Sequence, residues 1–310
     1  MEPLLSIVIT NYNYTHLLSK LFDNIMDQDI KDIEIVVVDD CSDTPCNKII
    51  NDYSDKGLNV ILFQNKVRQY TKDSRLNGIE AANGKLITFI DADDLFHGTK
   101  ALKYHVGEQL RTDADIVHFS MLSYTHEDDK INNQVFPWTK PFGEYIEGKD
   151  VFNTYVRSNL NGHNICGKII KKELWMKCLP AARASTIRRY CEDLFLSSLT
   201  FFHAQSYLGS TRIGYSREWI DKAQQKALGR AVTHYTLLAE FVPYVESNGV
   251  DKDILPLLKS FFLKFNHKYV FQFLETLQQQ EQVFTESNYT NMLQHGTPEK
   301  LLRAIMTGLV

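Results

Sequence analysis

Residues 33–38 (IEIVVV) constrain the fold more than any other part of this sequence, because they are β-branched and almost continuously apolar. Apolar side chains that follow one another without alternation must be covered on both faces, which is typical of a central strand in a parallel sheet. Comparable apolar runs at residues 5–10, 59–63 and 86–90 alternate with segments of helical spacing. This order predicts an α/β fold with a doubly wound, mostly parallel central sheet flanked by helices.

Start and stop signals place the intervening helices. Thr15 is suited to cap a helix whose apolar residues recur at positions 17, 18, 21, 22 and 25. A second helix is expected to begin within residues 42–45, since proline is tolerated in a first turn. A third is expected over residues 72–82, where Asn83-Gly84 forms a stop signal.

The second half of the chain has a looser pattern. Strands are expected at residues 115–124 and 167–170, with a long loop or hairpin over 132–147. Helices are expected from Lys171 and over residues 192–203, and from Trp219 onwards the sequence is almost wholly helical in pattern. We therefore expect a catalytic domain at residues 1–217 and a helical C-terminal region at residues 218–310.

Composition excludes several classes of protein. The chain has 310 residues, of which 44% are hydrophobic and 23% are charged, as in an ordinary soluble protein. Its net charge of −4 gives no basic face for nucleic acid. The five cysteines lack metal-site spacing, which favours a reduced, cytoplasmic setting. Met1-Glu2-Pro3 is unlike a secretory leader, and no stretch is apolar enough to span a bilayer, so membrane contact would be peripheral.

Polar residues follow the predicted strands where ligands bind in open α/β sheets. Thr10, Asp40 and Asp91 all lie at predicted carboxyl ends. Asp91 opens the run Asp91-Ala92-Asp93-Asp94, which we call the acidic turn, and whose three carboxylates repel one another unless a cation is present. Such oxygen-rich sites favour Mg²⁺ or Mn²⁺. A solvated turn is the alternative, and the neighbouring polar strand ends favour the site.

A second pair of carboxylates, Glu192 and Asp193, begins a predicted helix. We call them the helix carboxylates. Acidic residues are favoured at a helix N-terminus by the free N–H groups and the dipole, so their position by itself indicates capping.

Four segments together resemble a known family. They are residues 6–13 (SIVITNYN), 38–43 (VDDCSD), 75–84 (RLNGIEAANG) and 89–94 (FIDADD). In this order and spacing they are similar to family 2 glycosyltransferases with the GT-A fold, a Rossmann-like arrangement, over residues 5–217. The family usually has Pro before its Thr/Ser-Tyr-Asn and Gly where this chain has Cys41.

The resemblance implies a nucleotide-sugar donor and a place for it. Thr10 and Tyr12 would line the nucleotide pocket, and Asp40 would accept a hydrogen bond from the base, which is uracil in most relatives. Arg75 matches a basic position near the donor. Asp91 and the adjoining Ala92 would face the ribose.

The resemblance also implies the metal and the reaction. Asp93, with Asp91, would bind the Mn²⁺ or Mg²⁺ that holds the diphosphate. Asp193 would be the general base of an inverting transfer, with Glu192 as the alternative. The expected reaction moves a hexose from a UDP-sugar, UDP-glucose or a related one, to a hydroxyl of a glycan acceptor, either a polyprenyl-diphosphate-linked oligosaccharide or a surface polysaccharide.

Three further residues carry weaker expectations. His163, in a Gly/Asn loop, could touch the acceptor or a phosphate, but such a histidine is more often structural. Arg217, in a Tyr-x-Arg element, could approach the diphosphate, although an exposed arginine is the simpler interpretation. Asp94 has no assigned role.

Dehydrogenases and nucleotidyltransferases are the alternative enzyme classes with a similar sheet. The segment after the first strand lacks the GxGxxG of a dehydrogenase and the Gly-rich basic loop of a nucleotidyltransferase. A catalytically inactive nucleotide-sugar-binding or scaffold protein remains, against which the intact Asp91, Asp93 and Asp193 speak.

The C-terminal region suggests a surface role. Phe261, Phe265, Lys268 and Tyr269 recur at helical spacing, as in a basic aromatic helix that lies on a membrane. Packing on the catalytic domain or on a partner subunit is the commoner outcome for such a helix.

Overall fold

The structure is a computed structural model that describes residues 2–127, 130–135, 139–188, 190–218 and 227–279. The expected helical stretch from Trp219 is therefore described only over 227–279, and residues 219–226 and 280–310 lie outside the described part. The helices found there agree with the expectation.

Four parallel strands form the first half of the sheet, as predicted, in the order β3-β2-β1-β4. They are β1 (Leu5–Asn11), β2 (Ile33–Asp39), β3 (Val60–Gln64) and β4 (Leu86–Asp91). In register, Thr10 lies beside both Asp91 of β4 and Val38 of β2. The polar strand ends therefore meet at one edge of the sheet.

The sheet continues beyond β4 with mixed strand directions, in the order β9-β6-β10-β5. These strands are β9 (Lys168–Lys171), β6 (Ile116–Glu127), β10 (Ser206–Glu218) and β5 (Leu95–Phe96). Two further strands, β7 (Lys130–Gln134) and β8 (Tyr145–Glu147), pair with β6 and β10. β7 forms a hairpin with β6, so this hairpin lies N-terminal to most of the segment 132–147 in which a loop or hairpin was expected, and β8 at the end of that segment pairs with β10.

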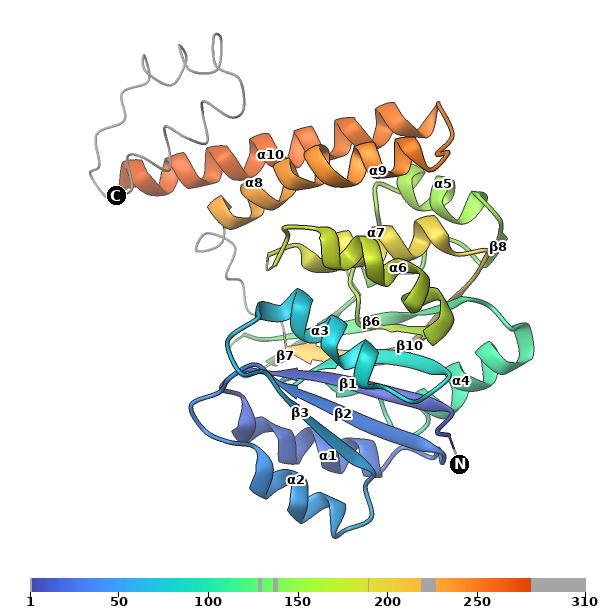
Figure 1. Ribbon diagram of the computed structural model, residues 1–310, viewed down its shortest axis with the longest axis vertical. Coiled ribbons are helices and arrows are strands. Elements are labelled where there is room, and N and C mark those ends of the chain that lie inside the picture. Colours follow the sequence, from blue (N-terminus) through green and yellow to red (C-terminus); the bar gives the residue numbers. More distant parts are fainter. Residues whose placement is uncertain (1, 128–129, 136–138, 189, 219–226, 280–310) are drawn as a thin grey trace.

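Helices cover both faces of the sheet (Figure 1). They are α1 (Leu18–Met26), which follows a 3-10 turn η1 (Thr15–Leu17), α2 (Asn47–Ser54), α3 (Tyr70–Ala81), α4 (Ala101–Thr112), α5 (Asp150–Arg157), α6 (Lys172–Ala184) and α7 (Glu192–His203). A C-terminal layer contains α8 (Ala227–Thr236), the π-helical turn η4 (Leu237–Phe241), α9 (Val242–Ser247) and α10 (Ile254–Gln279).

The start of α2 differs from the expectation within residues 42–45. Ser42 does not begin a helix, because its hydroxyl donates to Asp39 Oδ1 (2.6 Å) and accepts from the Asn13 N–H (2.9 Å). These bonds tie the residues after β2 to the loop after β1, so α2 begins only at Asn47.

α3 packs very closely on the parallel strands. A Cβ added at Gly78 would lie 2.4 Å from Val8 Cγ1, so only glycine allows this approach. α3 also contacts α6 and α7 on its other side. It therefore lies between the sheet and the helix that begins with Glu192 and Asp193.

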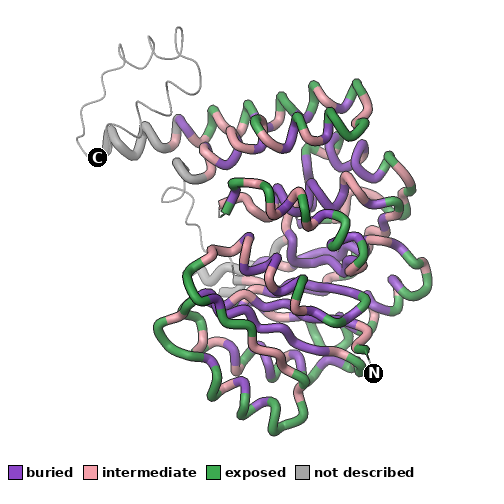
Figure 2. The backbone as a smooth tube through the Cα atoms, viewed as in Figure 1, coloured by how far each residue is buried: buried purple, intermediate pink, exposed green. Residues whose placement is uncertain are grey.

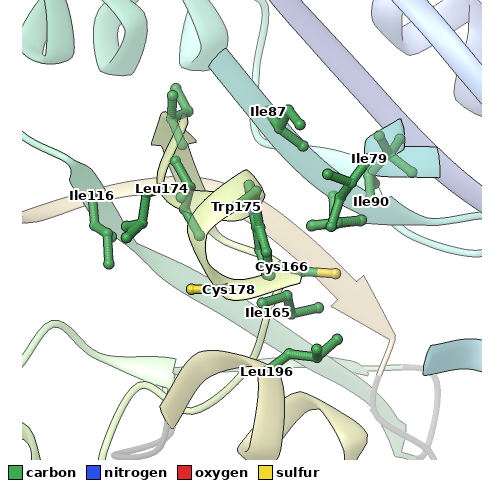
Figure 3. Close-up of a cluster of buried hydrophobic side chains, with 14 of the residues drawn as sticks. Ile79, Ile87, Ile90, Ile116, Ile165, Cys166, Leu174, Trp175, Cys178 and Leu196 are labelled. Carbon is green, nitrogen blue, oxygen red and sulfur yellow. The ribbon is translucent and has the colours of Figure 1, made fainter. Parts of the chain in front are cut away.

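A buried apolar core joins these layers. Trp175 of α6 is fully buried, and its ring meets Phe89 of β4 edge-on at 5.6 Å. Figure 3 shows Trp175 among Ile87 and Ile90 of β4, with Leu196 of α7 nearby.

All five cysteines are free thiols, and burial raises the pKa of Cys178 to about 12. Such a thiol is unreactive at neutral pH.

The C-terminal helices share this core. Phe241 of η4 contacts the rings of Phe152 and Phe195 at 6.3 and 6.1 Å. In α10, Leu258 and Phe262 are fully buried, and Phe265 and Tyr269 stack on His234 of α8. Figure 2 shows buried positions recurring between exposed ones along α10. The aromatic residues that suggested membrane contact thus pack against α8. No helix in the described part of the chain is long and apolar enough to cross a membrane.

Candidate active site

The residues predicted to bind the nucleotide lie after β1 and β2. Asp40 is buried, and its carboxylate accepts hydrogen bonds from Asn65 Nδ2 (2.8 Å) and from the backbone N–H groups of Gln69 (2.6 Å) and Tyr70 (2.9 Å). Asp40 therefore fixes the turn that leads into α3. One acceptor position of a carboxylate that accepts three bonds remains for a ligand.

Arg68, which was not predicted from the sequence as a site residue, lies over the ring of Tyr12. The guanidinium of Arg68 lies 3.7 Å from the centroid of the Tyr12 ring and 5.0 Å from that of Tyr70. An aromatic ring beside a cation can stack on a base and attract a phosphate. Arg68 is absent from the motifs, and only its closeness to Tyr12 in space reveals it.

The acidic turn follows β4, with each carboxylate in a different setting. Asp91 is 36% exposed, Asp93 is exposed and Asp94 is buried. Ala92, predicted to adjoin the donor, is also buried. Among the described residues, no group of three or more His, Cys, Asp and Glu side chains is arranged to hold a metal ion. Asp91 and Asp93 still fit a hard cation, because Mg²⁺ is usually held by one or two carboxylates together with substrate phosphates.

Asp94, which had no predicted role, supports the turn from behind. Its Oδ2 accepts a hydrogen bond from the Tyr215 hydroxyl (2.7 Å), whose oxygen in turn accepts from the Asp91 N–H (3.2 Å). Burial raises the pKa of Asp94 well above its ordinary value, as do the charges of Asp91 and Asp93. Arg217 opposes that rise and is half-buried, so the interpretation of Arg217 as an exposed residue is wrong.

Arg75 joins the acidic turn to the helix carboxylates. This side chain of α3 is only 2% exposed. Its Nη2 contacts Asp91 Oδ1 at 3.0 Å, and its Nη1 contacts Glu192 Oε1 at 3.3 Å and also pairs with Asp193. Burial alone would lower the pKa of Arg75, but Asp193 and Asp91 raise it well above its ordinary value. Arg75 is therefore a permanent cation between the two acidic groups.

The helix carboxylates point into this site from the first turn of α7. The Asp193 side chain is 28% exposed, whereas that of Glu192 is only 13% exposed. Burial, and then the charge of Asp193, raise the pKa of Glu192 to about 7. The chain enters α7 through Tyr190 and Cys191, which have left-handed φ values of 59° and 55°. Two such residues in succession, neither of them glycine, are strained and persist only where the surroundings hold them.

Two residues from the segment before α6 complete the surroundings. Lys168 is buried, donates to the Asn164 carbonyl, and has its pKa lowered by burial to about 7, against the opposing charge of Asp193. Lys168 was not among the site residues predicted from the sequence. His163 contacts the Leu160 carbonyl at 3.0 Å through Nδ1, and burial lowers its pKa while Asp193 opposes this.

Comparison with known proteins places this geometry in a family. The model of the family described as Glycosyl transferase family 2 matches residues 6–166, which end before the helix carboxylates. The chain is 34% identical over 94 residues to a GalNAc(5)-diNAcBac-PP-undecaprenol beta-1,3-glucosyltransferase of Campylobacter jejuni, covering 30% of each chain. It therefore spans less than a third of that relative's length.

A second relative and a solved structure cover more of the chain. The relative is a UDP-Glc:alpha-D-GlcNAc-diphosphoundecaprenol beta-1,3-glucosyltransferase of Escherichia coli. It is 27% identical over 183 residues, which cover 57% of this chain and 70% of the relative. The solved structure is a mannosyltransferase of Pyrobaculum calidifontis in complex with GDP-Man and Mn²⁺. It superimposes with a TM-score of 0.58 at 14% identity, over 100% of this chain and 80% of its own. The likeness confirms the GT-A fold.

Proposed function

Because this chain belongs to glycosyl transferase family 2, we propose that it is an inverting, metal-dependent hexosyltransferase that uses a UDP-sugar, UDP-glucose or a related hexose. The acceptor is a hydroxyl of a glycan that is carried on a polyprenyl diphosphate or belongs to a surface polysaccharide. Both curated relatives described above are named as glucosyltransferases with undecaprenol-linked substrates, and the second is named for UDP-Glc.

The observation that carries this proposal is the position of Arg75 between two sets of carboxylates. Its two terminal nitrogens contact Asp91 on one side and the helix carboxylates on the other. A transfer needs these two functions next to each other, since the leaving diphosphate and the acceptor hydroxyl lie on opposite sides of one anomeric carbon. The contacts of Arg75 with both groups support placing these two functions next to each other.

The donor would occupy the strand ends. Its base would lie near Tyr12 and the remaining acceptor position of Asp40, with Thr10 beside it and Arg68 available to the phosphates. Its ribose and diphosphate would lie along Asp91, Ala92 and Asp93. A bound Mn²⁺ or Mg²⁺, held by Asp93 with Asp91, would neutralise charge on the leaving diphosphate.

The helix carboxylates would carry the proton transfer. Asp193 accepts the proton of the acceptor hydroxyl as its oxygen attacks the anomeric carbon, and the bond from that carbon to the diphosphate oxygen breaks with inversion. Arg75 keeps the Asp193 carboxylate oriented. Glu192, whose pKa is raised to about 7, is the weaker base candidate because it is more deeply buried.

The acceptor side would lie at the cytoplasmic face of a membrane, with peripheral contact through α10. Leu257 and Leu263 are 47% and 45% exposed on this helix, and Lys259 and Lys264 are exposed near them. Anionic vesicles should co-sediment the wild-type protein more than a Leu257→Asp/Leu263→Asp variant. Equal sedimentation of the two would remove this part of the proposal.

Donor screening tests the whole proposal. UDP-glucose, other UDP-hexoses and GDP-mannose are added with Mn²⁺, and the melting temperature and UDP or GDP release are measured. We expect selective stabilisation by one UDP-hexose and slow release of UDP, both lost with EDTA and restored by Mn²⁺ or Mg²⁺. Donor binding without any hydrolysis or transfer would instead identify an inactive donor-binding protein, and full activity after chelation would exclude the metal.

A further inference from the structure

One carboxylate of the C-terminal helices reaches the turn at which α6 ends. Glu240 lies in η4, and its Oε2 accepts hydrogen bonds from Ser185 Oγ (2.7 Å) and from the backbone N–H of Thr186 (3.2 Å). Its Oε1 accepts from the Thr186 hydroxyl. A single side chain of η4 thus binds three donors on two consecutive residues, which lie shortly before the helix carboxylates in the sequence.

The same turn is held from its other side by α3. Lys72 is only 1% exposed, and its Nζ donates to the carbonyls of Ala182 (3.0 Å) and Ser185 (2.7 Å). Its backbone N–H donates to the Arg188 carbonyl (3.1 Å). Ser185 is therefore fixed through its carbonyl by α3 and through its hydroxyl by Glu240. Because α3 also carries Arg75, it already belongs to the active site described above, and Glu240 is the additional contact that fixes this turn.

Glu240 is itself held in a defined place. The wide turn η4 ends two residues before Pro243, which has no N–H and whose ring would clash with a carbonyl one turn earlier in a regular helix. A π turn is one way in which a helix accommodates such an interruption. The adjoining Phe241 is buried against Phe152 and Phe195, so packing fixes the rotation of this turn.

We propose that Glu240 is a positioning residue for Glu192 and Asp193. The inference rests on the proposed function, because it takes Asp193 as the general base. The chain between Thr186 and Glu192 is short and ends in the strained pair Tyr190 and Cys191. A strained entry to α7 stays in place only if the preceding residues are fixed. Releasing Ser185 and Thr186 from Glu240 would let this entry relax and move the Asp193 carboxylate.

The test replaces Glu240 and measures rate and donor binding separately. A misplacement of about 1 Å can lower a rate by about 10²-fold. For Glu240→Ala we expect kcat for UDP-glucose turnover with Mn²⁺ to fall by about 10–100-fold, while the Kd of UDP, measured by calorimetry, stays within about twofold of wild type. Glu240→Gln keeps one acceptor oxygen and should restore part of the rate. Thr186→Val should lower kcat in the same direction by less.

The matched control is Glu246→Ala on the neighbouring α9. Glu246 is exposed and pairs only loosely with Lys259, at 3.9 Å, so wild-type kcat is expected. A folded Glu240→Ala protein with wild-type kcat would overturn the proposal. So would a Glu240→Ala protein in which kcat, UDP affinity and melting temperature all fall together, because that is the result of general destabilisation. If Glu240→Ala does not fold, Ser185→Ala and Thr186→Val decide by the same criteria.

A failure of the proposed function would look different. Asp193→Asn with wild-type turnover would remove the base assignment whatever Glu240 does. An inactive Asp193→Asn together with a fully active Glu240→Ala would remove only the positioning role.

Discussion

The acidic turn and the helix carboxylates both contact Arg75, but their positions in the structure are fixed by different kinds of contacts. The acidic turn continues a buried parallel strand, and its Asp93 is exposed. The helix carboxylates follow two strained residues, and groups from α3 and η4 bind the turn that precedes those residues in the sequence. One group is set by its own strand, and the other depends on contacts distant in sequence.

This difference separates two kinds of chemistry. An exposed carboxylate at a strand end can exchange ligands with a charged donor that arrives from solvent. A partly buried base beside a fixed cation, which is the role proposed for Asp193, must already be in place when the acceptor binds, because proton transfer depends on geometry. Damage to the acidic turn should therefore weaken donor binding, and damage to the helix carboxylates should lower turnover with the donor still bound.

The largest effect is expected from Asp193→Asn. Asparagine keeps the shape and an oxygen for Arg75 but cannot take a proton at neutral pH. Turnover of the donor should fall by about 10²–10⁴-fold, as for the loss of a general base. Steady-state kinetics with the UDP-hexose selected by donor screening, and calorimetry with UDP and Mn²⁺, measure the two effects.

Asp93→Asn is the matched counterpart on the acidic turn. It should lose most of the stabilisation that UDP gains from Mn²⁺, which Asp193→Asn keeps. Turnover by Asp193→Asn within tenfold of wild type would contradict the assignment of donor binding to the acidic turn and proton transfer to the helix carboxylates.

An intermediate effect is expected from Arg75→Met, which removes the cation that joins them. Asp91, Glu192 and Asp193 would then face one another without a buried partner, and loss of one member of a buried ion pair costs about 3–5 kcal/mol. Urea unfolding should show a reduced free energy of unfolding.

Arg111→Met removes an exposed arginine that pairs with Glu108 and serves as the control, with no measurable change expected. If both arginine variants unfold at the same urea concentration as wild type, Arg75 does not hold the site together.

The smallest effect is a pH dependence at Glu192. Burial raises its pKa from 4.5 to about 7, so the folded state keeps a proton that the unfolded state releases between these values. The free energy of unfolding therefore falls as the pH rises from about 4.5 to about 7, and above this range the loss is complete. Glu192→Gln has no such loss. Its melting temperature relative to wild type should rise, on the order of a few degrees, between pH 5 and pH 8.

Glu246→Gln, at an exposed position of α9, should show a constant difference over the same range. A constant difference for Glu192→Gln as well would mean that Glu192 ionises normally.

Prediction from sequence was accurate where local pattern and tertiary role agree. The four parallel strands lie within one residue of their predicted bounds, and α7 spans residues 192–203 as expected. β10 was missed because polar residues and glycines interrupt its pattern. At Gly214 an added Cβ would lie 2.5 Å from the Phe119 ring, so glycine is required there by a neighbour far away in sequence. No local signal carries that information.

The sequence by itself determined the four parallel strands and the carboxylates that lie at their ends, because continuous apolar runs admit few arrangements and the residues after them must meet. Only the tertiary structure decided how those residues are connected. Arg75 lies beside Asp91 and Asp193, Tyr215 lies behind Asp94, and Glu240 binds the turn before α7. These pairs are separated by 16 to 121 residues, and hydrogen bonds over such separations form only when the packing of the whole chain brings their atoms together.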